Sequence, residues 1–112
     1  MNCNCDNMSS IFRGTTPTIV LKVTNEDFDM TLIDVCHVTI QNDTGRNKKV
    51  FEDPVIDTEE KTISVELCQE DTLEYEEGGI EIQVRIKLDD GRVIANKPIK
   101  TTMNKILEEG IL

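Results

Sequence analysis

The stretch Ile80–Leu88, "IEIQVRIKL", decides the fold class, because apolar and polar residues alternate through all nine positions. Successive side chains of a β-strand point to opposite faces of the sheet, so this pattern predicts a strand with one buried face and one exposed face. The residues expected inside are Ile80, Ile82, Val84, Ile86 and Leu88. Those expected outside are Glu81, Gln83, Arg85 and Lys87.

Shorter stretches on both sides repeat this alternation, with turn-forming residues between them. Further strands are predicted around Thr18–Val23, Val35–Gln41, Lys48–Glu52, Thr62–Leu67 and Val93–Met103. Asp90-Gly91 predicts a hairpin turn, and Pro98 predicts a break or an edge, because proline has no N–H for the ladder. Cys68–Glu77 predicts one short helical turn that bridges two sheets, with Leu73 as its apolar anchor. About seven short strands of this kind predict an all-β sandwich.

The chain has 112 residues, which predicts one domain. Residues 1–10 show no periodicity and predict a flexible N-terminal tail, followed by a single β-sandwich domain over residues 11–112. The apolar runs are four residues or shorter, too short for a membrane-spanning helix or an export signal. We therefore expect a protein made in the bacterial cytoplasm, with no membrane partner.

The net charge of −10 is concentrated in one segment. Between Glu52 and Glu81 there are twelve acids and one base, Lys61, whereas the rest of the chain has ten acids and eleven bases. An acidic surface repels phosphate backbones, which argues against nucleic acid as a partner. The acidic segment fits either a solvated face or a docking face for a basic neighbour.

The residues Val84–Lys105 have the opposite bias, with six bases and two acids. If the acidic and basic segments lie on different surfaces, copies of the chain could associate head to tail, and salt would weaken that contact. The alternative is that the two segments pair within one sheet, so that their charges cancel inside one molecule.

The cysteines are Cys3, Cys5, Cys36 and Cys68. Without an export signal they are expected as reduced thiols, with Cys36 buried beside Val38 and Ile40. His37 is the chain's one histidine and has the opposite strand parity, so a four-ligand structural zinc site is not expected. The oxygen-rich stretches "NEDFDMT" and "LDDGR" leave a weak calcium site open, although neither has EF-hand spacing.

Catalytic signatures are absent from the sequence: it contains no G-x-S-x-G, no P-loop and no G-x-G-x-x-G. A single histidine leaves little scope for a catalytic triad, and the absence of Trp with one Tyr leaves few rings on which a sugar could stack. We therefore expect no enzyme activity, no catalytic residue, no metal and no cofactor.

The stretch "RGTTPT", Arg13–Thr18, leads into the first long strand. Gly14 permits a sharp bend, Thr15 and Thr16 offer hydroxyls to local backbone groups, and Pro17 stands where its missing N–H costs least. Arg13 is not needed for this turn. It fits a solvated cation, a pairing with a carboxylate, or a contact to an adjacent subunit.

Three stretches carry a family resemblance: "IFRGTTPTIVLKV", "TISVELCQEDTLEY" and "GGIEIQVRIKLDDGRVIANKPIKTTM". They resemble small structural proteins of tailed bacteriophages and Gram-positive prophages, above all the tail-associated group related to the N-terminal domain of baseplate upper proteins. The resemblance implies an immunoglobulin-like sandwich that ends in the virion as a tail or baseplate module. It implies contacts with other phage structural proteins or with copies of itself, as a homo-oligomer.

The residues expected at such an inter-subunit contact are Phe12, Arg13, Arg85 and Lys87. A different class of function, a host-surface or carbohydrate-binding module, is the alternative. It predicts a concave site with converging polar groups and an aromatic platform.

Overall fold

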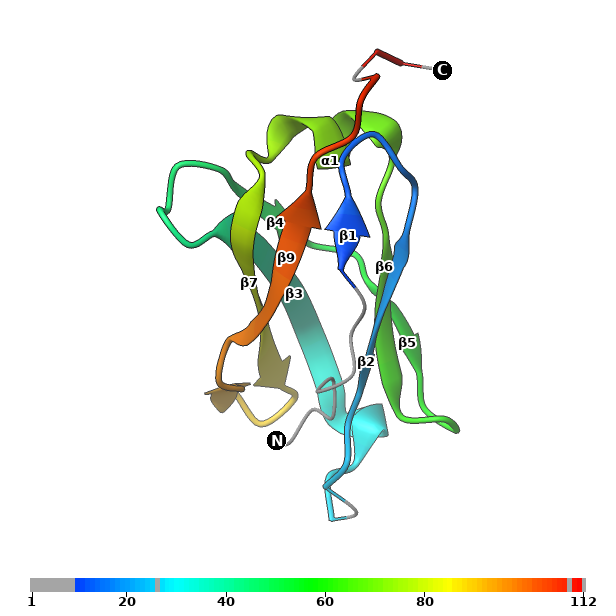
Figure 1. The fold of residues 1–112 in the computed structure, drawn as a ribbon. Coiled ribbons are helices and arrows are strands. Elements are labelled where there is room, and N and C mark those ends of the chain that lie inside the picture. Colours follow the sequence, from blue (N-terminus) through cyan, green and yellow to red (C-terminus); the bar gives the residue numbers. More distant parts are fainter. Residues whose placement is uncertain (1–9, 26, 109, 112) are drawn as a thin grey trace.

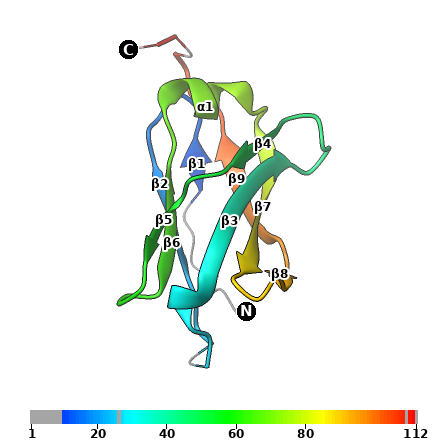
Figure 2. The ribbon, with the colours of Figure 1, turned by 180° about the vertical axis from the view of Figure 1, so that it is seen from behind.

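In the computed structural model, which describes residues 10–25, 27–108 and 110–111, two β-sheets pack face to face (Figures 1 and 2). The larger sheet has the strand order β1-β9-β7-β3-β4, and β8 also pairs with β7; the smaller sheet has the order β2-β6-β5. The strands are β1 (Ile11–Phe12), β2 (Thr18–Lys22), β3 (Ile33–Asn42), β4 (Lys48–Phe51), β5 (Val55–Asp57), β6 (Thr62–Glu66), β7 (Gly78–Leu88), β8 (Val93–Ala95) and β9 (Ile99–Asn104). The predicted β-sandwich is confirmed, with nine strands in the described residues where about seven were expected.

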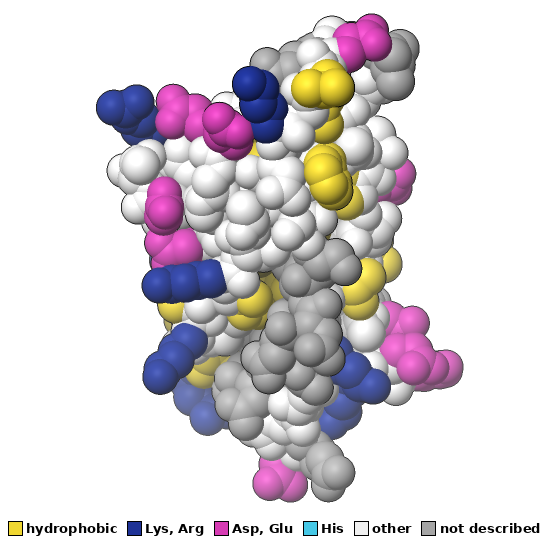
Figure 3. Space-filling model, in the orientation of Figure 1, with side chains coloured by type: hydrophobic (Ala, Val, Ile, Leu, Met, Phe, Trp, Pro, Cys, Tyr) yellow, Lys and Arg dark blue, Asp and Glu magenta, His cyan; other side chains and the backbone are white. Residues whose placement is uncertain are grey.

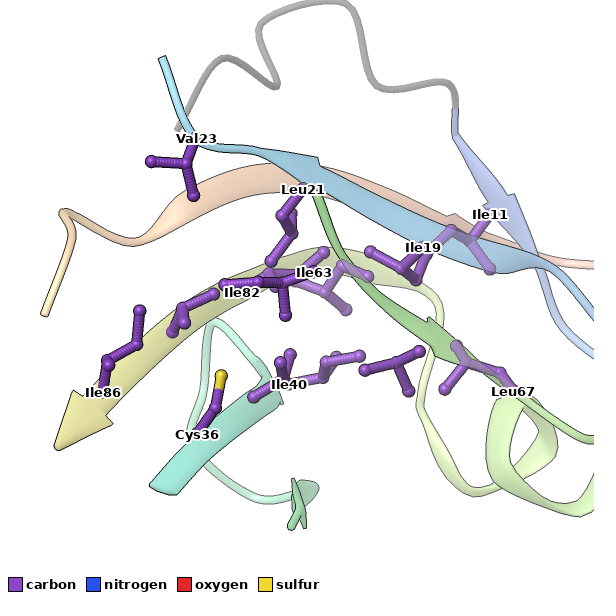
Figure 4. Packing of buried hydrophobic residues seen from close by; sticks show 14 of the residues in the cluster. Ile11, Ile19, Leu21, Val23, Cys36, Ile40, Ile63, Leu67, Ile82 and Ile86 are labelled. Carbon is purple, nitrogen blue, oxygen red and sulfur yellow. The ribbon is translucent and has the colours of Figure 1, made fainter. Parts of the chain in front are cut away.

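The centre of the larger sheet is the antiparallel pair β3 and β7, which stay in register from Val35 opposite Lys87 to Asn42 opposite Ile80. The expected inner face of β7 is confirmed: Ile80, Ile82, Val84, Ile86 and Leu88 are all at most 5% exposed. Cys36, Val38 and Ile40 are buried on β3, also as expected. These side chains point toward those of the smaller sheet, as Figure 4 shows for Ile40, Ile82 and Leu21.

The smaller sheet contributes the other half of the core. Ile19 and Leu21 of β2 and Ile63 and Val65 of β6 are buried, and the alternating exposed residues of both strands point away from the core. β2 pairs with β6 with Leu21 opposite Ile63, so the apolar rows of the two strands lie side by side. The alternation that predicted these strands also fixes which face each of them buries.

The edge of β7 is shared by two strands, and the predicted break near Pro98 separates them. β8 pairs with the end of β7 and β9 with its start. Between β8 and β9, the backbone N–H of Val84 has no strand carbonyl as its acceptor. It donates instead to the side-chain Oδ1 of Asn96 at 2.8 Å. Gln83 Nε2 donates to the carbonyl of Asn96 at 2.8 Å, which holds this connection against the sheet.

One end of the sandwich is closed by α1 (Gln69–Glu74), which connects β6 to β7 and so bridges the two sheets as predicted (Figure 1). The expected anchor was Leu73, but Leu73 is only half-buried. Tyr75, which directly follows the helix, is 1% exposed and donates from its hydroxyl to the carbonyl of Ile40 at 2.7 Å. The anchor is therefore Tyr75, because its ring reaches the core while its hydroxyl finds an acceptor there. The other helix, η1 (Met30–Leu32), is a single 3₁₀ turn before β3.

The stretch Arg13–Thr18 fastens β1 to α1. Gly14 has φ +74°, a conformation that favours glycine, and a Cβ at this position would lie 2.8 Å from Ile106 Cδ1. Arg13 Nη2 donates to the carbonyl of Leu73 at 2.9 Å, and the Thr72 hydroxyl donates to the carbonyl of Thr15 at 2.9 Å. Arg13 therefore pairs with a helix carbonyl, which accounts for a cation beside the turn.

The predicted tail, residues 1–10, lies outside the described residues except for Ser10, and so do Cys3 and Cys5. Cys36 and Cys68 are not joined in a disulfide; the first is buried in β3 and the second is exposed before α1. Among the described residues, no helix is long and apolar enough to cross a membrane.

Candidate functional site

The outer face of the larger sheet brings together polar side chains from three neighbouring strands. His37, Thr39 and Gln41 of β3 lie opposite Arg85, Gln83 and Glu81 of β7, respectively. On the other side of β3, Lys48 and Val50 of β4 lie opposite Gln41 and Thr39. Directly opposite residues in an antiparallel pair have their Cβ atoms about 5 Å apart, so these side chains form one continuous surface.

This surface is hollowed. A depression of about 370 Å³ is lined by His37, Thr39, Gln41, Lys48, Val50, Glu81, Gln83, Arg85 and Pro98. A second, of about 250 Å³, is lined by Val35, His37, Arg85, Lys87 and Val93. His37 and Arg85 line both depressions, so the two adjoin at this cross-strand pair. We call the two together the basic groove.

The cations of the basic groove are available to a ligand. Lys48, Arg85 and Lys87 are exposed, and none of them has an ion-pair partner in the described part of the chain. Glu81 is the one acid among the lining residues, and it lies opposite Lys100 on β9 as well as Gln41 on β3. The groove therefore has excess positive charge in a protein whose net charge is −10.

A second polar cluster, beside α1, is by contrast internally balanced. Lys49 forms an ion pair with Asp71 and lies 3.7 Å from a carboxylate oxygen of Glu74, while Arg46 lies 3.6 Å from Glu76. Asp71 also accepts the backbone N–H of Cys68 at 2.9 Å. Because each cation here has an acid beside it, this cluster offers no excess charge to a ligand.

The pKa values of this second cluster follow from its contacts. The hydrogen bond to Asp71 raises the pKa of Lys49. Burial alone would raise the pKa of Asp71, but the bonds from Lys49 and from the Cys68 N–H outweigh it and lower that pKa. Desolvation raises the pKa of the buried Tyr75 hydroxyl, with a further contribution from the charges of Asp71 and Glu74.

The predicted inter-subunit residues do not form one site. Arg85 and Lys87 lie on the outer face of β7 and line the basic groove. Phe12 is 49% exposed on β1, at the edge of the same sheet, and Arg13 is half-buried against α1. Whether any of them contacts another subunit stays a prediction.

The sequence did not indicate that Lys48 and Gln41 join Arg85 in one site. Their outward parity was readable from the alternation, but their proximity follows from the strand order β7-β3-β4. That order is set by non-local pairing, which a single sequence does not show.

Sequence comparison with protein families and with characterised proteins gives no match. Comparison of folds finds the crystal structure of CopC from Methylosinus trichosporium OB3b, with a TM-score of 0.53 and 12% sequence identity. The match covers 94% of this chain and 91% of CopC. At this identity the likeness establishes a shared β-sandwich fold.

This finding corrects the function expected from the sequence. A solved structure that shares the fold over nearly the whole chain is CopC, which has no link to phages, so the expected virion structural role is wrong. The alternative, a carbohydrate-binding module, lacks its expected platform, since no Trp, Tyr or Phe lines the basic groove.

The charges around His37 favour an anion over a metal cation. Residues 10–25, 27–108 and 110–111 contain no group of three or more His, Cys, Asp or Glu that could hold a metal ion. His37 lies directly opposite Arg85, and Lys48 lines the same depression. Positive charge around an imidazole opposes the binding of a cation and favours the binding of an anion.

Proposed function

We propose that this protein is a non-catalytic binding module that takes a carboxylate-bearing ligand into the basic groove. The observation that carries the proposal is the set of cations Lys48, Arg85 and Lys87 around a hollow surface, without ion-pair partners in the described residues. A depression of about 370 Å³ is within the size range of small-ligand sites.

The chemistry of the lining favours a carboxylate. Arg85 can bind a carboxylate through two parallel N–H···O bonds, and Gln41, Thr39 and His37 beside it are side chains that can donate hydrogen bonds. The backbone of β3 is engaged by β4 on one side and β7 on the other, so donors to the ligand come from side chains. The net charge of −10 disfavours long polyanions, so a short acidic ligand fits best.

The test is calorimetric titration with a capped tetraglutamate peptide at low ionic strength, with tetralysine as the negative probe. Binding of tetraglutamate is expected, and Arg85→Gln should weaken it roughly 10- to 100-fold, as the loss of a charged hydrogen bond does. The matched control is Arg92→Gln, because Arg92 is also an exposed arginine, lies in the β7–β8 turn and is paired with Asp90 at 2.7 Å. Equal affinity of wild type and Arg85→Gln, or a loss confined to Arg92→Gln, would refute the proposal.

Two further probes test whether the groove prefers a different class of ligand, a phosphate or a metal ion. Tripolyphosphate binding tighter than tetraglutamate binding would show that the groove selects phosphate groups over carboxylates. Copper(II) is the probe suggested by the fold of CopC. A rise in melting temperature with copper that His37→Ala removes would assign His37 to a metal site and contradict the anion proposal.

A further inference from the structure

The β5–β6 hairpin ends in an exposed acidic turn. Asp57, Glu59 and Glu60 are all exposed, and Asp57 Oδ1 accepts the N–H groups of Glu59 and Glu60 at 3.0 Å each. These bonds order the turn and leave the two glutamate carboxylates without a hydrogen-bond or ion-pair partner in the described residues. We call Asp57, Glu59 and Glu60 the acidic tip.

Lys61, the base that follows the tip in the sequence, reaches toward another loop. Lys61 has φ 55°, and its Nζ donates to the carbonyl of Asn25 at 3.3 Å. Its charge acts on Asp29, in the loop before η1, and contributes to the lowered pKa of that carboxyl, after the hydrogen bonds from Thr31. The tip therefore carries three like charges with Lys61 turned toward another loop.

The tip and the basic groove cannot meet within one molecule. The tip ends a hairpin of the smaller sheet, whereas the groove is on the face of the larger sheet that points away from the smaller one (Figures 1 and 2). In Figure 3, basic side chains gather at the lower left, where β7 and β8 lie. Acidic side chains project at the lower right, at the end of the β5–β6 hairpin, with further basic side chains beside them. Strand pairing thus keeps these two charged regions apart on different sheets.

We infer that the acidic tip of one copy of this chain occupies the basic groove of another copy, with Glu59 and Glu60 facing Arg85 and Lys48. The inference rests on the proposed function, and it names the carboxylate-bearing partner. Charge complementarity supports it: the tip presents three carboxylates on a narrow hairpin, and the groove presents unpaired cations around a hollow. Both surfaces keep their backbone pairing, so the contact requires no refolding.

Such a contact is heterologous. Each complex leaves one tip and one groove free, so copies add head to tail until the chain closes into a ring or extends as a filament. The contact is electrostatic and exposed, so salt weakens it: the Debye length falls from about 30 Å at 0.01 M salt to about 3 Å at 1 M. Association at low salt that reverses at high salt is the expected signature.

The experiment is sedimentation velocity on the full chain at both salt concentrations, with one variant for each surface. Glu59→Gln/Glu60→Gln removes the tip and keeps the groove, and Arg85→Gln weakens the groove and keeps the tip. Each variant alone should sediment as a monomer at low salt. An equimolar mixture contains one intact groove and one intact tip, so it should form dimers and stop there.

A control variant matches the tip variant in charge. Glu52→Gln/Asp53→Asn neutralises two adjacent exposed acids in the β4–β5 connection and should associate like wild type. A mixture of the two surface variants that stays monomeric would overturn the inference, as would equal weakening by the control. If wild type stays monomeric at low salt while tetraglutamate still binds and Arg85→Gln abolishes that binding, the proposed function stands and the second copy is not its ligand.

Discussion

The two faces of the larger sheet are built from the same strands but have different roles: the inner face forms the core and the outer face carries the basic groove. On β7 the inner side chains are at most 5% exposed, while on the outer face Glu81 and Gln83 are half-buried and Arg85 and Lys87 are exposed. The inner face needs only apolar side chains of suitable volume, because burial is non-directional. The outer face acquires its chemistry from which polar residues become neighbours across β7, β3 and β4. Substitutions on the inner face should therefore change stability, and those on the outer face should change binding.

The largest expected effect comes from Ile82, which is 0% exposed at the centre of the core. Ile82→Ala should lower the free energy of unfolding by about 2–5 kcal/mol, because it removes buried methyl groups and leaves a cavity. Lys87→Ala, on the outer face of the same strand, should change it by less than about 0.5 kcal/mol. Urea denaturation of both variants measures the difference. Similar losses for the two would break the distinction between the faces.

The inner face could be predicted from the sequence because its signal is local. Alternation within Ile80–Leu88 already states which side chains share a face, and any apolar sheet opposite will bury them. The position of Tyr75 could not be predicted this way, because its acceptor, the carbonyl of Ile40, is 35 residues away in the sequence. The basic groove was hidden for the same reason, since it exists only once Lys48, His37 and Arg85 are brought together by strand pairing.

A smaller loss of stability is expected when the hydroxyl of Tyr75 is removed. This hydroxyl is the polar group of a side chain that otherwise packs in the core. Tyr75→Phe should cost about 1–3 kcal/mol, because it removes the hydrogen bond to Ile40. Burial raises the pKa of the phenol, so the folded state holds its proton where the unfolded state has lost it. Stability that is fully present below about pH 10 should therefore fall as the pH rises above that value.

Tyr75 is the chain's only tyrosine and there is no tryptophan, so phenolate absorbance reports on this group alone. Alkaline titration should show the phenolate appearing together with unfolding, as followed by circular dichroism. Tyr75→Phe should lack the alkaline loss of stability relative to its own value at neutral pH. A phenolate that forms near pH 10 in the folded protein would mean that the hydroxyl is accessible to water.

The smallest effect on stability is expected at the ion pair of Lys49. Lys49 is an exception to the division between the two faces, because it is a charged residue on the inner-facing side of β4. It lies opposite the buried Ile40, and α1 supplies Asp71 as its partner. Asp71→Asn should destabilise by about 1 kcal/mol, since it weakens both the ion pair and the capping bond to Cys68. Glu66→Gln, an exposed acid with the same charge change, should stay within about 0.5 kcal/mol.

Lowering the pH tests the Lys49–Asp71 ion pair in a second way. The pKa of Asp71 is lowered in the folded state, so its contribution is present above the unfolded value of about 3.9 and is lost as the pH falls through the folded pKa. Wild type should therefore lose more stability than Asp71→Asn when the pH is lowered below about 4. Urea denaturation at neutral and acid pH measures both slopes. If wild type and Asp71→Asn lose the same stability with falling pH, the ion pair with Asp71 is not what allows a charge at position 49. The 37% exposure of the Lys49 side chain on an edge strand would then account for it.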